Sequence, residues 1–399
     1  MIEITNMRQG AVLNHNHGAE TDDGLTVTVE GISESGRPVR VNGGLAEMDG
    51  RGFSCPVKLA KKVNTVTASA TTPYGTYSQE ITVVWDKKSF RRYNFYIDDH
   101  SFLFTDLAKE RPVRAFDHFY LAGLQKISEK YGFKATLNCF YRNDHHPFEL
   151  KDMPDIWKSE FIANSDWLRF SFHSYSEFPD RPYLESGAEE FGRDYDLVKN
   201  EIIRFAGEES FIPPVVIHWA NISPAAAQEL VSRGTHCYSG PFRPRVMGGP
   251  SLSERRKGGD IDQIAKRTTS AIRDLPDVAE GIRAHFLNPE ESSYLNAHRT
   301  FYDPAIGIFF SGGSGCCCNL VPLEEIPERY AKIFENGKRC GSENYSGASH
   351  EQYTFPYYPN FIPDHLQRLE AATRCLVEDG GCSPVFFNEG LLGNMAWEK

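Results

Sequence analysis

The sequence changes its rhythm near residue 88, and this change constrains the fold more than any other feature. Between Gly24 and Trp85, short runs of alternating apolar and polar residues are separated by glycine and proline, as in Leu25-Thr26-Val27-Thr28-Val29. Alternation with a period of two is typical of half-buried strands, and short strands at this spacing predict a β-sandwich. We therefore expect a small all-β domain over residues 1–88.

After the predicted linker Asp86–Ser89, apolar strands alternate with helices. Tyr93–Ile97 is predicted as a strand, Phe116–Tyr131 as a helix that ends at Gly132, and Lys134–Tyr141 as the next strand. Further strands are expected at Trp167–His173, Val215–His218, Thr235–Tyr238 and Pro384–Phe387, and further helices at Asp194–Phe205, Pro224–Arg233 and Pro363–Val377. Repeated βα units predict a parallel sheet over residues 89–399 that closes into a barrel, with 241–300 as a charged, glycine-rich excursion.

Composition argues against nucleic acid and anionic membranes as partners and against a disulfide framework. With 399 residues and a net charge of −11, the chain has room for two domains, and its diffuse acidic field disfavours nucleic acid and anionic membranes as partners. No signal peptide or membrane-spanning run is evident, so we expect a cytoplasmic protein. The nine cysteines show no CxxC pair, which favours reduced thiols, and Cys316-Cys317-Cys318 is predicted to pack as small apolar groups.

The pair Asp98-Asp99 ends the first predicted strand of the second domain. Two adjacent carboxylates repel each other unless a cation or a solvated turn relieves them. A divalent metal bound to one carboxylate would leave the other free to act as a base, whereas a turn or helix cap is the simpler alternative. Catalytic groups gather where barrel strands run out into loops, so the position suits a site.

Histidines follow other predicted strands at the same register. His173 ends one strand, His218 ends another, and His350 is placed at a late strand. Each alone is more often a hydrogen-bonded core residue, but acids and histidines that recur at several strand ends predict one shared pocket. The segment Asn143–His146 follows the second strand and either reaches this pocket or forms an exposed loop.

In this arrangement the chain resembles the polysaccharide deacetylase family, the NodB-homology carbohydrate esterases. Asp98-Asp99 matches the family's Asp-Asp motif, and His173-Ser174-Tyr175-Ser176-Glu177 matches His-Ser-x-x-His without its second histidine. His218-Trp219-Ala220 stands where the family has Arg-x-Pro-Tyr, and His350 fits the last motif, Leu-x-His, ahead of a helix and a strand. Residues 1–88 resemble the immunoglobulin-like modules that precede many bacterial carbohydrate-active domains.

The resemblance implies a deformed (β/α)7-type barrel that removes an acetyl group from a carbohydrate. It implies that Asp99 and His173 bind a divalent metal, that Asp98 is the general base and that His350 is the general acid. Zinc is the expected ion, with cobalt, nickel or manganese as alternatives.

The third ligand is left open between two side chains. His218 arrives from a neighbouring strand end, and Glu177 would reach the same metal if one helical turn followed His173. Trp219, Tyr175, Glu351 and Arg181 are candidate substrate contacts, with structural packing as the alternative. An acetylated carbohydrate or other small substrate is the expected partner. A catalytically silent, carbohydrate-binding relative is the alternative function, whereas adjacent acids do not suit glycosidic cleavage.

Overall fold

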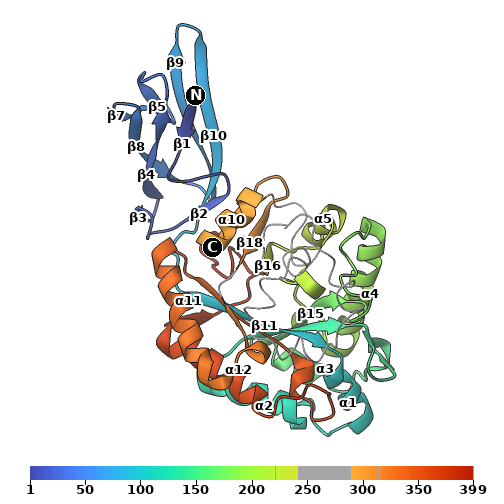
Figure 1. Ribbon diagram of the computed structural model, residues 1–399. Helices are drawn as coiled ribbons and strands as arrows, with labels where there is room; N and C mark the ends of the chain where they lie inside the picture. The colour runs from blue at the N-terminus through green and yellow to red at the C-terminus, as the bar shows by residue number, and fades with distance from the viewer. Residues whose placement is uncertain (221, 241–288, 313–314, 399) are drawn as a thin grey trace, which may run out of the picture.

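The computed structural model describes residues 1–220, 222–240, 289–312 and 315–398, and it divides into an all-β part and an α/β part (Figure 1). The all-β part contains two sheets. The first, in the order β1-β4-β8-β7 with β3 paired to β4, consists of β1 (Ile2–Ile4), β3 (Ala19–Thr21), β4 (Gly24–Ser33), β7 (Glu47–Asp49) and β8 (Gly52–Leu59). The second, in the order β2-β10-β9-β5-β6, consists of β2 (Ala11–Leu13), β5 (Val39–Val41), β6 (Gly44–Leu45), β9 (Val63–Thr72) and β10 (Gly75–Trp85).

The two sheets share a core that follows from the alternating sequence. Along β4, Leu25, Val27 and Val29 are buried while the residues between them are exposed. They pack in one apolar cluster with inward residues of β8 and β9, such as Val57 and Val66. The prediction of an all-β region before residue 88 is thus confirmed at the level of strands and sheets.

The α/β part is built on a parallel sheet of order β15-β12-β11-β20-β19, with β21 also paired to β11. Its strands are β11 (Arg92–His100), β12 (Ala135–Phe140), β15 (Leu168–Ser174), β19 (Gly315–Cys317), β20 (Asn344–His350) and β21 (Ser383–Pro384). Every residue of β11 is buried, which explains why its central part, Tyr93–Ile97, is mostly aromatic and apolar and does not alternate with exposed polar residues.

Helices surround this sheet (Figure 1). They are α1 (Phe102–Glu110), α2 (Phe119–Tyr131), α3 (Lys158–Ala163), α4 (Ala188–Ala206), α5 (Pro224–Ser232), α10 (Pro289–His298), α11 (Ile326–Cys340) and α12 (His365–Arg374). α12 packs between α2 and α11, and α4 packs on β15 and α5. Among the described residues, no helix combines the length and the apolar character that a bilayer crossing requires.

A closed barrel is not confirmed: the described strands leave the parallel sheet open. Three other strands, β16 (Cys237–Ser239), β17 (Thr300–Asp303) and β18 (Ile308–Ser311), form a separate sheet, and β13 (Arg142–Asn143) pairs with β14 (Phe148–Glu149). The predicted strand Val215–His218 is wrong: the chain there follows Pro213 and Pro214, which have no N–H to donate, and ends in a 3₁₀ turn at His218–Ala220.

Other predicted elements are shifted or fall outside the described residues. The last helix ends at Arg374 and continues as a π turn over Cys375–Asp379, and only Ser383–Pro384 of the last strand pairs. Residues 241–288 of the predicted excursion are not among the described residues, and α10 follows them. Cys316 and Cys318 are buried in the core, as predicted, while Cys317 is partly buried.

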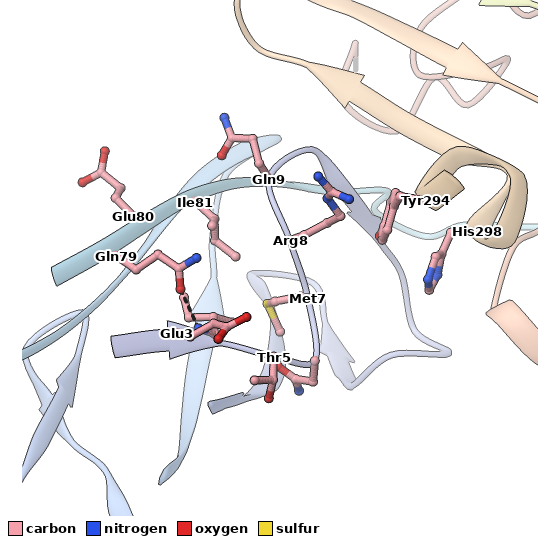
Figure 2. Close-up of a pocket in the computed structure, with 12 residues that line it drawn as sticks. Glu3, Thr5, Met7, Arg8, Gln9, Gln79, Glu80, Ile81, Tyr294 and His298 are labelled. Carbon is pink, nitrogen blue, oxygen red and sulfur yellow. Dashed lines mark hydrogen bonds between the residues drawn. The ribbon is translucent and has the colours of Figure 1, made fainter. Parts of the chain in front are cut away.

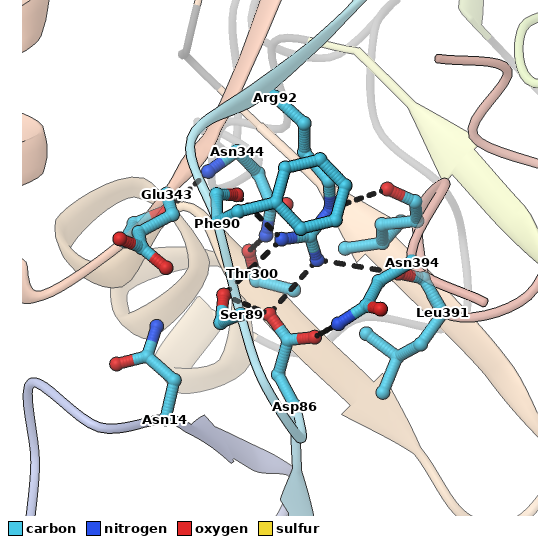
Figure 3. A network of polar contacts seen from close by, with 12 residues as sticks. Asn14, Asp86, Ser89, Phe90, Arg92, Thr300, Glu343, Asn344, Leu391 and Asn394 are labelled. Carbon is cyan, nitrogen blue, oxygen red and sulfur yellow. Dashed lines mark hydrogen bonds and ion pairs between the residues drawn. The ribbon is translucent and has the colours of Figure 1, made fainter. Parts of the chain in front are cut away.

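The predicted linker is tied down by a buried ion pair (Figure 3). Arg92 at the start of β11 places its Nη2 2.8 Å from Oδ2 of Asp86, and neither side chain is more than 1% exposed. The Nδ2 of Asn394 donates to Asp86 Oδ1 at 2.8 Å, and Arg92 Nε donates to the carbonyl of Leu392. The end of β10, the start of β11 and the carboxyl-terminal segment therefore meet at one charged pair.

A cavity of about 680 Å³ lies at a second junction, between the all-β part and α10 (Figure 2). Arg8 and Glu3 line it from the all-β part, and Tyr294 and His298 line it from α10. The guanidinium of Arg8 lies 5.5 Å from the centre of the Tyr294 ring. The two parts of the chain therefore contact each other away from the linker as well.

We expect the Asp86→Ala substitution to lower the free energy of unfolding by about 3 kcal/mol or more, because it leaves the Arg92 guanidinium buried without its counter-charge. Urea denaturation followed by circular dichroism measures this loss. Glu328→Ala, which removes the exposed Glu328–Lys332 pair, serves as the control and should leave the midpoint unchanged. Equal midpoints for the two variants would contradict a structural role for the Asp86–Arg92 pair.

Candidate metal centre

The carboxyl end of β11 turns two adjacent carboxylates toward one place. Asp99 has a backbone φ of 67°, in the left-handed region, and the pairing between β11 and β12 shifts register between Ile97 and His100. An irregularity of this kind re-aims side chains that would otherwise point to opposite faces of the sheet. As a result, Asp98 Oδ1 lies 3.9 Å from His173 Nδ1, while Asp99 Oδ1 lies 3.1 Å from Nε2 of the same ring.

Three side chains from three segments converge at this point. Asp99 comes from β11, His173 from β15, and His218 from the 3₁₀ turn that replaces the predicted strand. The Nδ1 of His218 lies 3.4 Å from Asp99 Oδ1, and one ligand atom from each of the three residues lies within 4.8 Å of the others. All three side chains are buried. The structure thus brings together three of the four predicted metal ligands.

The donor atoms of this cluster fit a divalent ion. Asp99 Oδ1 is buried and makes no hydrogen bond, although two imidazole nitrogens face it. A buried carboxylate oxygen without a hydrogen bond is costly, and a cation shared with the two nitrogens would remove that cost. Two imidazole nitrogens and one carboxylate oxygen form a donor set that suits zinc and related transition metals.

Neighbouring groups orient two of the three candidate ligands, Asp99 and His218. Gln352 Nε2 donates to Asp99 Oδ2 at 2.9 Å. His218 Nε2 lies 2.9 Å from the carbonyl oxygen of Glu177, and because a carbonyl can only accept, Nε2 carries the proton. The Nδ1 lone pair of His218 therefore faces Asp99, which is the arrangement found in ligating histidines.

The surroundings of Asp98 and Asp99 shift the pKa values of these two carboxyls in opposite directions. Burial and the neighbouring charge of Asp99 raise the pKa of Asp98 well above its ordinary value, despite a 2.7 Å hydrogen bond from Asn138 Nδ2. Burial would also raise the pKa of Asp99, but the imidazoles of His350, His173 and His218 hold it well below its ordinary value. Two adjacent acids with opposite shifts are typical of functional sites.

His350 stands directly across from Asp98 in the parallel pairing of β11 and β20. Its Nδ1 lies 3.0 Å from Asn319 Oδ1 and 3.8 Å from Cys317 Sγ. The strand predicted for this segment is observed as β20, which ends at His350. The backbone of His350 therefore lies beside that of Asp98, and its imidazole is near enough to help lower the pKa of Asp99.

Glu177 is not part of the cluster. The chain after β15 continues in bends rather than in the helical turn that would have carried the Glu177 carboxylate toward His173. That carboxylate instead contacts Nε2 of His145. The alternative prediction of Glu177 as the third ligand is therefore wrong, and His218 is the third member of the cluster.

The Glu351 side chain lies at the start of α1. This side chain is completely buried and accepts hydrogen bonds from the backbone N–H groups of Ser101, Phe102 and Leu103. Burial raises its pKa to about 8, although these three donors act in the opposite direction. Glu351 thus caps α1, in line with the packing alternative, and its contact with a substrate stays a prediction.

The remaining candidate substrate contacts are partly buried, and one of them, Trp219, lies next to a candidate ligand. The Arg181 guanidinium lies over the Trp219 ring, 5.8 Å from its centre, and the Trp219 ring lies 6.0 Å from that of His218. Tyr175 stacks on Tyr141 at 5.3 Å. Their contact with a substrate stays a prediction.

Sequence reasoning missed two polar residues next to the acids, Asn138 and Gln352. Asn138 interrupts an otherwise largely apolar strand, which was a usable signal, whereas Gln352 has no distinguishing pattern. Comparisons with known proteins add no assignment, because neither a family model nor a curated protein matches the chain. The case for the site therefore depends on its own geometry.

We expect the purified chain to bind one zinc ion with an affinity that falls about 100-fold or more in His218→Ala, because a directly ligating imidazole is lost. Competition against a chromophoric zinc chelator measures this affinity. His17→Ala, in the all-β part, is the matched control and should bind zinc like the unchanged protein. Tight zinc binding that survives in His218→Ala would contradict the assigned ligand set.

We expect Glu351→Ala to lower the free energy of unfolding by about 2 kcal/mol or more, because three buried N–H groups lose their acceptor. Glu351→Gln, which keeps one carbonyl oxygen at this position, should lose less. Urea denaturation of both variants provides the comparison, and an alanine variant as stable as the glutamine variant would argue against the capping role.

Proposed function

We propose that this protein is a metal-dependent hydrolase that removes an acetyl group, as an amide or an ester, from a carbohydrate. The observation that carries the proposal is the buried Asp99-His173-His218 cluster with Asp98 and His350 beside it. The order of these acids and histidines along the chain is the order expected from the resemblance to polysaccharide deacetylases. The same resemblance supports the proposal that the open parallel sheet belongs to a deformed barrel.

A divalent ion held by Asp99, His173 and His218, most suitably zinc, would supply Lewis-acid activation of water and of an acetyl carbonyl. The protein would supply the proton transfers. Asp98 lies within 3.9 Å of His173 and is held by the amide of Asn138, so its carboxylate is positioned to accept the proton of the attacking water.

His350 would complete the reaction as the general acid. Its contact with Asn319 fixes the ring from the side of Nδ1, and its pairing opposite Asp98 places the acid and the base on neighbouring strands. Protonated His350 would give its proton to the departing amine or alkoxide. Burial keeps His173 neutral, because its pKa is lowered to about 4, so this imidazole would serve as a ligand rather than as the acid.

A catalytically silent carbohydrate-binding protein is the second candidate. It is favoured by one observation: the chain has Glu177 where the family motif has its second histidine, and the Glu177 carboxylate contacts His145 instead of the cluster. Such a protein would keep the metal and the surrounding aromatic side chains but would not turn over.

We expect the zinc-loaded protein to release acetate from N-acetylated chitooligosaccharides or from acetylated xylooligosaccharides, and Asp98→Asn to lower the rate about 10²–10⁴-fold, because an amide cannot accept the proton. An enzymatic acetate assay measures release. Asp155→Asn, an exposed change of the same kind before α3, is the control and should leave the rate unchanged.

Two outcomes would count against the proposal. If Asp98→Asn released acetate as fast as the unchanged protein, Asp98 would not be the base. If the zinc-loaded protein released no acetate from either substrate, the binding function would be favoured over the hydrolase.

A further inference from the structure

Glu177 connects the cluster to a neighbouring loop through two different groups. Its backbone carbonyl accepts the hydrogen bond from His218 Nε2 at 2.9 Å, while its side-chain carboxylate contacts Nε2 of His145. The His145 and Glu177 side chains are 28% and 21% exposed, so the pair lies at the edge of the buried site. One residue thus joins a candidate metal ligand to a side chain that lies outside the cluster.

His218 depends on this carbonyl for its orientation. His218 is the first residue of the 3₁₀ turn His218–Ala220, and the second residue of that turn, Trp219, has a φ of 63°. Strand pairing therefore does not fix the backbone of His218. The ring packs edge-on against Phe140, with centres 5.0 Å apart, but an apolar contact does not select which nitrogen faces Asp99. The Glu177 carbonyl does select it, because it requires a proton on Nε2.

The segment that carries this carbonyl is held by the loop around His145. Residues 175–178 are irregular, with bends at Tyr175 and Glu177, and the Phe178 N–H donates to Asp144 Oδ2 at 2.9 Å. His145 is fixed in turn, because its N–H donates to Asn143 Oδ1 at 2.9 Å. Its ring packs against Phe102 and Tyr358, with ring centres 5.4 and 5.8 Å apart. The contact between His145 and Glu177 therefore links a well-packed ring to an irregular segment.

We propose that His145 and Glu177 form a positioning pair that holds the Glu177 carbonyl against His218 and so sets the third metal ligand. The inference rests on the metal site of the proposed function and gives Glu177 a role different from ligation. Partners of ligating histidines typically contribute 10–100-fold to metal affinity. Loss of the side-chain contact at position 145 or 177 should therefore weaken metal binding without removing any ligand.

The test measures zinc affinity in the full-length chain, by chelator competition and without substrate. His145→Phe and Glu177→Met, which cannot form the contact, should bind zinc about 10-fold more weakly or worse. His145→Gln and Glu177→Gln each keep a hydrogen-bonding group and should stay within about threefold of the unchanged protein. His146→Phe is the matched control, because His146 contacts Phe102 and Tyr357 but not Glu177.

Cobalt absorption spectra add a readout that reports ligand geometry directly. We expect the visible bands of the cobalt-loaded protein to weaken or shift in His145→Phe and Glu177→Met and to stay unchanged in His146→Phe. Circular dichroism establishes that each variant is folded. If one of the disruptive variants fails to fold, the other and its glutamine counterpart still decide the question.

Zinc affinity and cobalt spectra that are unchanged in His145→Phe and Glu177→Met would overturn the positioning role. Failure of the proposed function looks different: the unchanged protein would bind zinc and respond to these substitutions but release no acetate. Absence of zinc binding in the unchanged protein would overturn both.

Discussion

The convergence of strand ends at Asp99 is the constraint on which the rest of the site depends. Parallel pairing brings the carboxyl ends of β11, β15 and β20 to one edge of the sheet. The left-handed conformation at Asp99 then brings two successive acids within reach of one imidazole. A regular strand would have placed these carboxylates on opposite faces, one of them in an apolar core where an unpaired charge is strongly unfavourable. The irregular backbone at Asp99 and the placement of both acids therefore belong together.

The acids also require the histidines around them. Two buried carboxylates so close together cannot both ionise without nearby compensating groups, and the surrounding side chains favour ionisation of one carboxyl more than of the other. Asp99 is held ionised by three neighbouring imidazoles, whereas Asp98 retains its proton more readily and is supported by Asn138. This asymmetry suits one carboxylate to ligation and the other to proton transfer, and it arises from residues that four separate segments contribute.

Much of this arrangement could be predicted from the sequence, because strand ends are visible as apolar runs that stop at polar residues. Asp98, Asp99, His173 and His350 were found in this way, and the structure places them together. His218 was predicted as a candidate ligand for a partly wrong reason, since it lies in a 3₁₀ turn after Pro213 and Pro214 and not at the end of a strand. The position of His218 is set instead by a tight turn, which no periodic sequence pattern predicts.

Contacts between distant segments could not be predicted. The role of Glu351 depends on backbone N–H groups about 250 positions earlier in the chain. The place of Glu177 depends on a loop near residue 144 that bends the chain away from a helical path. Closure of the sheet into a barrel was expected from repeated βα units, but strand count and pairing are set by tertiary packing, which local patterns do not report.

Anomalous scattering from crystals grown with zinc, collected on both sides of the zinc absorption edge, tests the central claim most directly. We predict a single strong peak bounded by the Asp99 carboxylate, His173 Nε2 and His218 Nδ1. A zinc peak held by other residues, or no peak at this cluster in zinc-saturated crystals, would contradict the account.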